Sequence, residues 1–322
     1  MAVFHAQQRS RTRQAFLQTK RTSQIIVILV FVVAGQFMLN LSTRRKLRAL
    51  RSSTVEKDDH HISCQNHVPP RDFDETQVDT IYSPGYPGSG SEMFRELILA
   101  LTGREASTEF YDLAPRCEPH APTCKTHHTS PKISNFPETG MHPRIFLLLR
   151  NPRKALPSFV NYEYEGTLNL THHKEQAPEP IWNLWRDQFF DSHIRLWGDL
   201  ILEWSRAFEV AAFLSYEEMT KEPTGPLLLH KVAKELQAAH SSVSTDVDCL
   251  WHRVVMEKGA NKRSARQYNP GFTKAQQTMM IEILESVKRA VPSLATTMED
   301  YILDVRLNTR VVDDPSAASA QG

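Results

Sequence analysis

The chain has 322 residues, of which 40% are hydrophobic and 23% are charged, and its formal net charge is +1. This length allows one large domain or two small ones. A net charge near zero provides no overall positive field to attract nucleic acid, so we expect no nucleic-acid partner.

An uncharged, apolar segment lies near the N-terminus. The 22 residues from Thr22 to Thr43 include no charged side chain, and as a helix they would rise about 33 Å, enough to cross a bilayer. A cleaved signal peptide is the alternative, but its apolar region is usually shorter and no Ala-x-Ala-type site precedes the basic run. We therefore expect a transmembrane signal anchor at 23–42, after a cytosolic basic tail at 1–22.

The orientation of this segment is not decided by charge, because five basic residues precede it and five follow it. The short N-terminal arm favours a single-pass type II protein of the Golgi membrane with a lumenal C-terminal domain. The sequon Asn169-Leu-Thr171 agrees with a secretory lumen. In an oxidising lumen the four cysteines can form disulfides, although spacing does not give their connectivity and free buried thiols remain an alternative. They are Cys64, Cys117, Cys124 and Cys249.

The remaining chain divides into a polar stem at 43–76, a folded domain at 77–306 and a disordered tail at 307–322. The residue patterns predict strands and helices in an alternating order, with a long loop at 114–140. This order is typical of an α/β domain with a parallel sheet. The tryptophan-rich stripe within 181–208 is interpreted as core. The expected strands are 78–82, 107–113, 144–150 and 210–214, and the expected helices are 91–101, one beginning at Pro152, 181–208, 224–239, 245–256 and 273–291.

A glycine-rich turn follows the first expected strand. Gly85, Gly88 and Gly90 turn the chain, and Ser91 can cap the next helix. A strand, a glycine turn and a helix start together point backbone N–H groups at an anion, and the helix N-terminus adds partial positive charge. We therefore expect phosphate binding here, with an ordinary strand–helix turn as the alternative. The turn is neither a Walker loop nor a G-x-G-x-x-G fingerprint.

Two further segments carry candidate chemistry. In Lys125-Thr126-His127, the histidine can accept a proton near neutral pH and the lysine can hold a negative leaving group. A surface histidine cluster is the alternative reading of this triplet. Arg150 ends the most apolar strand, where ligands gather in parallel sheets, and Ser158 follows it. A guanidinium there offers a planar fork for phosphate, and a local ion pair is the alternative.

A basic loop at 257–264 includes Lys262 and Arg263, and it can close over a polyanion or remain solvated. No C-x-x-C pair occurs, and we expect no metal site.

Together these stretches resemble the sulfotransferase family that uses 3′-phosphoadenosine 5′-phosphosulfate (PAPS), over about Val78 to Met279. The Tyr-Pro-Gly-Ser-Gly form is similar to that of membrane-anchored sulfotransferases found with WSC domains, although no cysteine-rich WSC module is present here. The matching motifs are Pro87-Gly-Ser-Gly-Ser-Glu92, Lys125-Thr126-His127, Arg150 to Ser158, Tyr216-Glu217-Glu218-Met219, and Lys258-Gly259 with Lys262 and Arg263.

The resemblance implies a P-loop-like three-layer domain that transfers a sulfuryl group from PAPS, the co-substrate, to a hydroxyl of a carbohydrate or glycoprotein acceptor. No metal is required by that chemistry. His127 would be the base, and Lys125 would stabilise the bridging oxygen of the donor. The residues implied in binding the donor are Gly88, Ser89, Gly90, Ser91, Arg150 and Ser158, with Lys262 or Arg263 closing over the nucleotide.

The sequence departs from the family pattern at two positions. Gly88 stands where many members have lysine, and Glu92 stands where a hydroxyl residue is expected. A carboxylate about 5 Å from a phosphate would cost about 3 kcal/mol at an effective dielectric of 20, unless Arg95, at i+3, pairs with it. A non-catalytic binding protein of the same fold is therefore an alternative. Another P-loop phosphotransferase is a further one, although the Walker lysine and hydroxyl are absent.

Overall fold

The computed structural model describes residues 64, 79–109, 117, 121–131, 144–170, 175–239, 243–257 and 269–313. All of them belong to one compact unit, Ile62–Gly322. The expected basic tail, the signal anchor, most of the stem and the end of the tail lie outside the described residues. Within the part that is described, no helix combines the length and the apolar character needed to cross a membrane.

The centre of this unit is built from parallel strands. Strands β1 (Ile81–Pro84), β3 (Thr123–Thr126) and β2 (Ser107–Glu109) form a sheet in the order β1-β3-β2. Strands β4 (Arg144–Leu149) and β5 (Glu209–Ser215) form a second parallel pair. A parallel bridge between Gly85 and Leu148 places β1 beside β4. The predicted class, a mixed α/β fold with parallel strands, is confirmed.

Strand β4 shows how the sheet is covered. Its side chains alternate between two hydrophobic clusters, because successive residues of a strand point to opposite faces. Ile145, Leu147 and Leu149 pack in one cluster, and Phe146 and Leu148 pack in the other. Both faces are therefore buried, as the continuous apolar run predicted.

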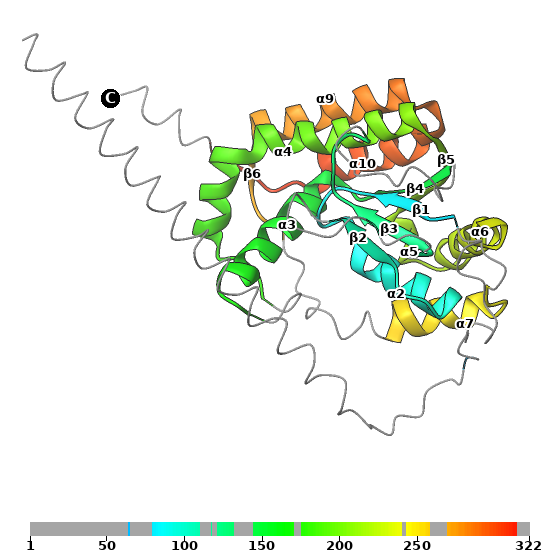
Figure 1. Cartoon of the computed structure of the whole chain (residues 1–322). Helices are drawn as coiled ribbons and strands as arrows, with labels where there is room; N and C mark the ends of the chain where they lie inside the picture. Colours follow the sequence, from blue (N-terminus) through cyan, green and yellow to red (C-terminus); the bar gives the residue numbers. More distant parts are fainter. Residues whose placement is uncertain are drawn as a thin grey trace, which may run out of the picture. The chain divides into compact units, whose positions relative to one another are not determined.

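Helices cover both faces of the strands (Figure 1). One cluster receives side chains from α3 (Pro152–Thr167), α4 (Glu179–Ala207), α9 (Lys274–Ala290) and α10 (Ala295–Asn308). The other receives side chains from α2 (Ser91–Thr102), α6 (Thr224–Ala239) and α7 (Val247–Trp251), which continues as the π-helix η3 (His252–Glu257). Two shorter helices are α5 (Tyr216–Met219) and the 3-10 turn η4 (Pro292–Leu294).

The tryptophan stripe of α4 is part of the core, as predicted. Trp182, Trp197 and Trp204 are at most 1% exposed. Their indole nitrogens donate hydrogen bonds to backbone oxygens of other segments: Gly271 at 2.9 Å, Arg150 at 3.1 Å and His128 at 2.9 Å, respectively. Each ring therefore buries its apolar surface and satisfies its single donor. Trp185 differs, since it is only partly buried and packs beside the others.

Four sequence predictions need correction. Lys125 and Thr126 lie in β3, inside the stretch expected to be a loop, because this four-residue strand pairs with neighbours on both sides. Ser91 is the first residue of α2, not its cap; the cap position is Gly90, which has a left-handed backbone. The domain end set at 306, and the start of the disordered tail at 307, are wrong, because α10 continues to Asn308. Strand β7 (Val311–Val312) then pairs with β6 (Phe272–Thr273).

All four cysteines are paired. Disulfides join Cys64 to Cys249 and Cys117 to Cys124. The first connects a residue near the start of the unit to α7, and the second ends in β3. Pairing, which the sequence left open, is therefore decided in favour of disulfides over free thiols.

Because β4 is buried on both faces, truncating one of its side chains is expected to lower the stability of the fold. We expect Leu147→Ala, at a side chain that is 0% exposed, to lower the free energy of unfolding by about 2–5 kcal/mol. Leu307→Ala, at a side chain that is 71% exposed on α10, makes the same chemical change and should cost within about 0.5 kcal/mol. Urea unfolding of the two variants measures both values. Equal losses would contradict the assignment of β4 to the core.

Candidate functional site

The loop between β1 and α2 has a backbone that only glycine fits. Gly88 and Gly90 have φ angles of 90° and 88°, which L side chains rarely adopt. A Cβ on Gly88 would lie 2.7 Å from the Ala155 carbonyl oxygen, and a Cβ on Gly90 would overlap the Tyr216 ring. The loop is therefore held against α3 on one side and α5 on the other.

The loop presents unfilled hydrogen-bonding capacity. The first hydrogen bond within α2 runs from the Phe94 N–H to the Gly90 oxygen at 3.0 Å. The N–H groups of Ser91, Glu92 and Met93 lie before it and therefore have no acceptor within the helix. Ser89 is 1% exposed, and its hydroxyl has no hydrogen-bond partner among the described residues. A buried hydroxyl without a partner is costly, and the N–H groups at a helix N-terminus favour an anion.

His127 lies beside the start of this loop. Parallel pairing aligns Thr126 with Pro84, so β3 and β1 end at the same level. The His127 Nδ1 is 2.5 Å from the Gly85 carbonyl oxygen. Because a carbonyl only accepts, Nδ1 carries the hydrogen, and Nε2 is the basic nitrogen of the neutral ring. Burial, and then the positive charge of Lys125, lower the pKa of His127 to about 3, so the ring is neutral at pH 7.

Lys125 contacts the first turn of α2. Its ammonium lies 2.6 Å from one carboxylate oxygen of Glu92, and Arg95 lies 3.0 Å from the other. Burial raises the pKa of Glu92, but Lys125 and then Arg95 outweigh that effect and lower the pKa to about 2. Burial lowers the pKa of Lys125, and pairing with Glu92 opposes this change. The sequence left open whether Glu92 pairs with Arg95, and it did not predict the contact between Glu92 and Lys125.

Arg150 and Ser158 reach the same loop from β4 and α3. The Arg150 guanidinium donates to the Gly88 carbonyl oxygen at 2.7 Å and lies 4.3 Å from the centre of the Tyr216 ring. A Cβ on Gly88 would be 3.2 Å from the Ser158 Cβ. The structure therefore brings together the glycine turn, Lys125 with His127, and Arg150 with Ser158. Lys262 and Arg263 lie outside the described residues.

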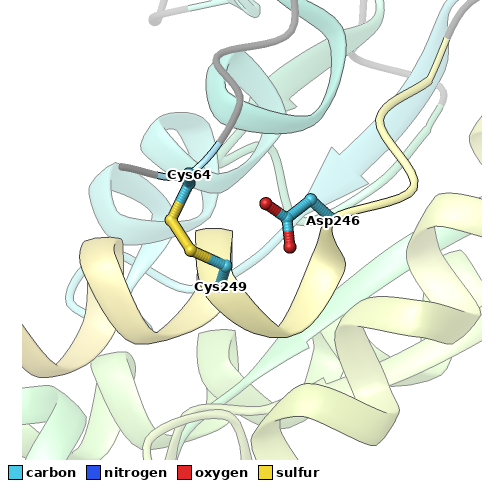
Figure 2. A group of neighbouring side chains, drawn as sticks. All are labelled: Cys64, Asp246 and Cys249. Atoms are coloured by element: carbon cyan, nitrogen blue, oxygen red, sulfur yellow. A yellow bond between two sulfur atoms is a disulfide. The ribbon is translucent and has the colours of Figure 1, made fainter. Parts of the chain in front are cut away.

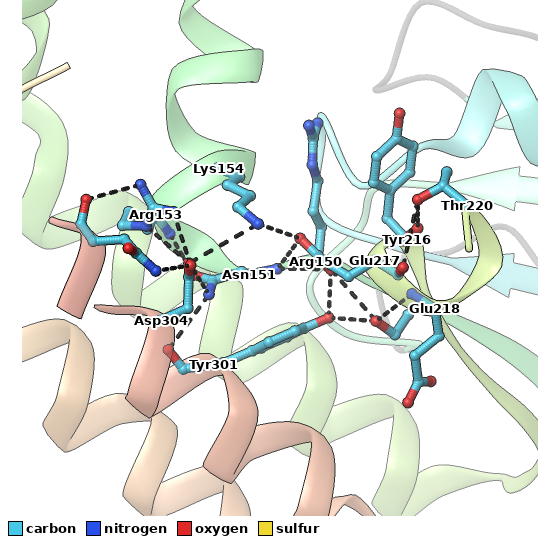
Figure 3. A network of polar contacts seen from close by, with 12 residues as sticks. Arg150, Asn151, Arg153, Lys154, Tyr216, Glu217, Glu218, Thr220, Tyr301 and Asp304 are labelled. Atoms are coloured by element: carbon cyan, nitrogen blue, oxygen red, sulfur yellow. Dashed lines mark hydrogen bonds and ion pairs between the residues drawn. The ribbon is translucent and has the colours of Figure 1, made fainter. Parts of the chain in front are cut away.

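A polar network joins the residues that follow β4 and β5 to α10 (Figure 3). Glu217 accepts from the Tyr301 hydroxyl at 2.9 Å and from the Asn151 N–H at 3.3 Å. Asp304 accepts from the Asn151 amide and from Arg153, each at 2.9 Å. These contacts fix Asn151 and the first turn of α3, directly after Arg150.

Sequence reasoning named Glu217 but missed Tyr301 and Asp304. The available signal was their i, i+3 spacing, which places both on one face of a helix. It was lost because no helix was predicted over 295–308, where the chain forms α10.

One other cluster combines residue types that bind metals (Figure 2). Ligand atoms of Cys64, Asp246 and Cys249 lie within 4.8 Å of one another. The two sulfurs are bonded to each other, so neither is the thiolate that binds metal ions. As long as this disulfide is formed, the cluster offers one carboxylate and is a poor metal site.

Comparison of the chain with protein-family models, with curated proteins and with solved structures found no match.

The ion pairs of Glu92 predict a pH-dependent contribution to stability. The folded-state pKa of about 2 is below the ordinary value of about 4.3. The contribution is therefore complete above pH 4.3 and is lost as the pH falls towards 2. We expect Glu92→Gln to lower the free energy of unfolding at pH 7 and to lower it less at pH 3. Urea unfolding of both proteins at pH 7, 5 and 3 measures this difference. A difference that stays constant would contradict the ion-pair assignment.

Proposed function

We propose that this chain is a sulfotransferase that moves a sulfuryl group from PAPS to a hydroxyl of a carbohydrate or glycoprotein acceptor. One observation carries the proposal. Three segments that are distant in sequence meet at the carboxyl ends of β1, β3 and β4: the glycine turn, Lys125 with His127, and Arg150 with Ser158. Parallel α/β sheets bind ligands at this edge.

The strand arrangement supports the finer fold assignment. Pairing places β3 between β2 and β1, and the Gly85–Leu148 bridge continues the series to β4 and β5. The order is therefore β2-β3-β1-β4-β5, with helices on both faces. We infer a P-loop-like three-layer domain, in which the β1–α2 turn lies near the middle of the sheet.

The residues suggest a division of roles in donor binding. The Ser89 hydroxyl and the N–H groups at the start of α2 would bind the 5′-phosphosulfate oxygens. Arg150 and Ser158 would bind the 3′-phosphate, because a guanidinium presents a planar set of donors. Lys262 or Arg263 would close over the nucleotide.

The transfer step needs a base and a stabilised leaving group. His127 Nε2 would take the proton from the acceptor hydroxyl as its oxygen attacks sulfur. The bond from sulfur to the bridging oxygen would break, and adenosine 3′,5′-bisphosphate would leave. The Lys125 ammonium would offset the negative charge that develops on that bridging oxygen. None of these roles requires a metal.

The two disulfides support a secretory location, because such bonds persist in oxidising compartments. With the apolar segment at 23–42, they are consistent with a single-pass type II protein of the Golgi membrane. In that orientation the folded unit would be lumenal.

A non-catalytic binding protein of the same fold is the second candidate. The observation that favours it is the Glu92 carboxylate at the N-terminus of α2, bound to Lys125. Both candidates would bind the nucleotide, and only the first would transfer sulfate. A P-loop phosphotransferase is disfavoured because the Gly-Lys-Ser/Thr ending is absent.

Nucleotide binding tests the site. We expect adenosine 3′,5′-bisphosphate to bind the lumenal domain in a calorimetric titration. Arg150→Gln should raise the Kd about tenfold to a hundredfold, because a hydrogen bond to a charged group contributes about 1.5–3 kcal/mol. Arg144→Gln is the matched control, since Arg144 starts the strand that Arg150 follows and pairs with Glu209 and Glu235. No binding by the wild type, or equal effects of the two variants, would contradict the assigned site.

Catalysis tests His127. We expect His127→Ala to lower the rate of sulfate transfer about 10²- to 10⁴-fold, with the Kd for adenosine 3′,5′-bisphosphate nearly unchanged. His230→Ala, at an exposed histidine on α6, should leave both values unchanged. The pKa of His127, lowered to about 3, also predicts that the wild-type rate shows no fall with a midpoint near 6.5. Transfer that survives in His127→Ala would rule out its role as the base.

A further inference from the structure

Glu92 places a negative charge where the fold favours an anionic ligand. It is the second residue of α2, at the end of the helix that carries partial positive charge. One carboxylate oxygen lies 2.6 Å from the Lys125 ammonium and the other 3.0 Å from Arg95. The Glu92 carboxylate is therefore paired with the Lys125 ammonium, which a bound phosphosulfate would also need.

The three charged side chains differ in how firmly they are held. The Lys125 side chain is 6% exposed and belongs to β3, whereas the Glu92 side chain is 46% exposed and that of Arg95 is 26% exposed. Glu92 is thus the member with room to move. If the Glu92 carboxylate leaves Lys125, it can keep its ion pair with Arg95, which lies one turn away on the same helix.

We propose that Glu92 is an internal competitor of the donor: its carboxylate pairs with Lys125 when no donor is bound and releases it when the 5′-phosphosulfate binds. This inference rests on the proposed function and adds a residue that sets donor affinity. The exchange replaces one anion beside Lys125 with another, so Lys125 has an anionic neighbour in both states.

A purely structural ion pair makes the opposite prediction. If Glu92 only positions Lys125 for the donor, its removal disorders Lys125 and weakens binding. If Glu92 competes with the donor, its removal strengthens binding even though the folded protein becomes less stable. The sign of the change in affinity therefore separates the two roles.

The test compares two nucleotides that differ at the 5′ end. Adenosine 3′,5′-bisphosphate carries the 5′-phosphate that would meet Lys125, and adenosine 3′-monophosphate does not. We expect Glu92→Gln to lower the calorimetric Kd of the bisphosphate about tenfold, less than the repulsion of a bare carboxylate would give, because Arg95 offsets part of the charge. The Kd of the monophosphate should change by less than about twofold.

Glu203→Gln is the matched control. Glu203 pairs with Arg206 at i+3 on α4, at 3.2 Å, so this variant makes the same change in charge and breaks the same kind of pair away from the loop. It should leave both Kd values unchanged. An equal gain in Glu203→Gln would show a general effect of net charge and would overturn the inference.

The remaining outcomes separate this inference from the proposed function. If the wild type binds neither nucleotide, both proposals fail. If the wild type binds the bisphosphate and Glu92→Gln binds it equally or more weakly, only the internal competition is wrong. An equal gain in affinity for the monophosphate would also overturn the internal competition, because the effect of the substitution would not be localised at the 5′ end.

Discussion

Gly85 is the residue on which the arrangement of the site depends. Its N–H donates to Thr126 of β3 at 3.2 Å, it bridges Leu148 of β4, and its carbonyl oxygen accepts from His127. A Cβ at this position would lie 2.8 Å from the Leu148 Cβ, so only glycine allows the chain to pass this close to β4. Three strands therefore end together, and their following residues share one edge.

The cations at that edge are held by contacts within the chain. Arg150 is fixed between the Gly88 carbonyl and the Tyr216 ring, and Lys125 is buried beside Glu92. Burial without a counter-charge would favour a neutral lysine. Glu92 counteracts this effect, so the carboxylate that stands at the loop also helps to keep Lys125 charged. Under the proposed competition, keeping Lys125 charged and binding the donor tightly make opposite demands on Glu92.

The sequence was sufficient where a pattern is long or its chemistry is local. The five apolar residues of β4 and the periodicity of α6 predicted those elements well. The strand β3 was missed because four residues carry no clear alternation, and its structure comes from pairing with β1 and β2. The contact between Glu92 and Lys125 joins residues 33 positions apart. It depends on the register of two strands, which residue patterns do not fix.

The disulfide between Cys64 and Cys249 has a mechanical consequence. It is a covalent connection from the beginning of the folded unit to α7, and it bypasses β1. Tension applied to the chain before Cys64 would therefore pass first into α7, a helix packed on α2 and α6. The strand that leads into the glycine turn would be shielded from that load. A domain tethered at its N-terminal side would thus keep the geometry of the loop while the tether is pulled.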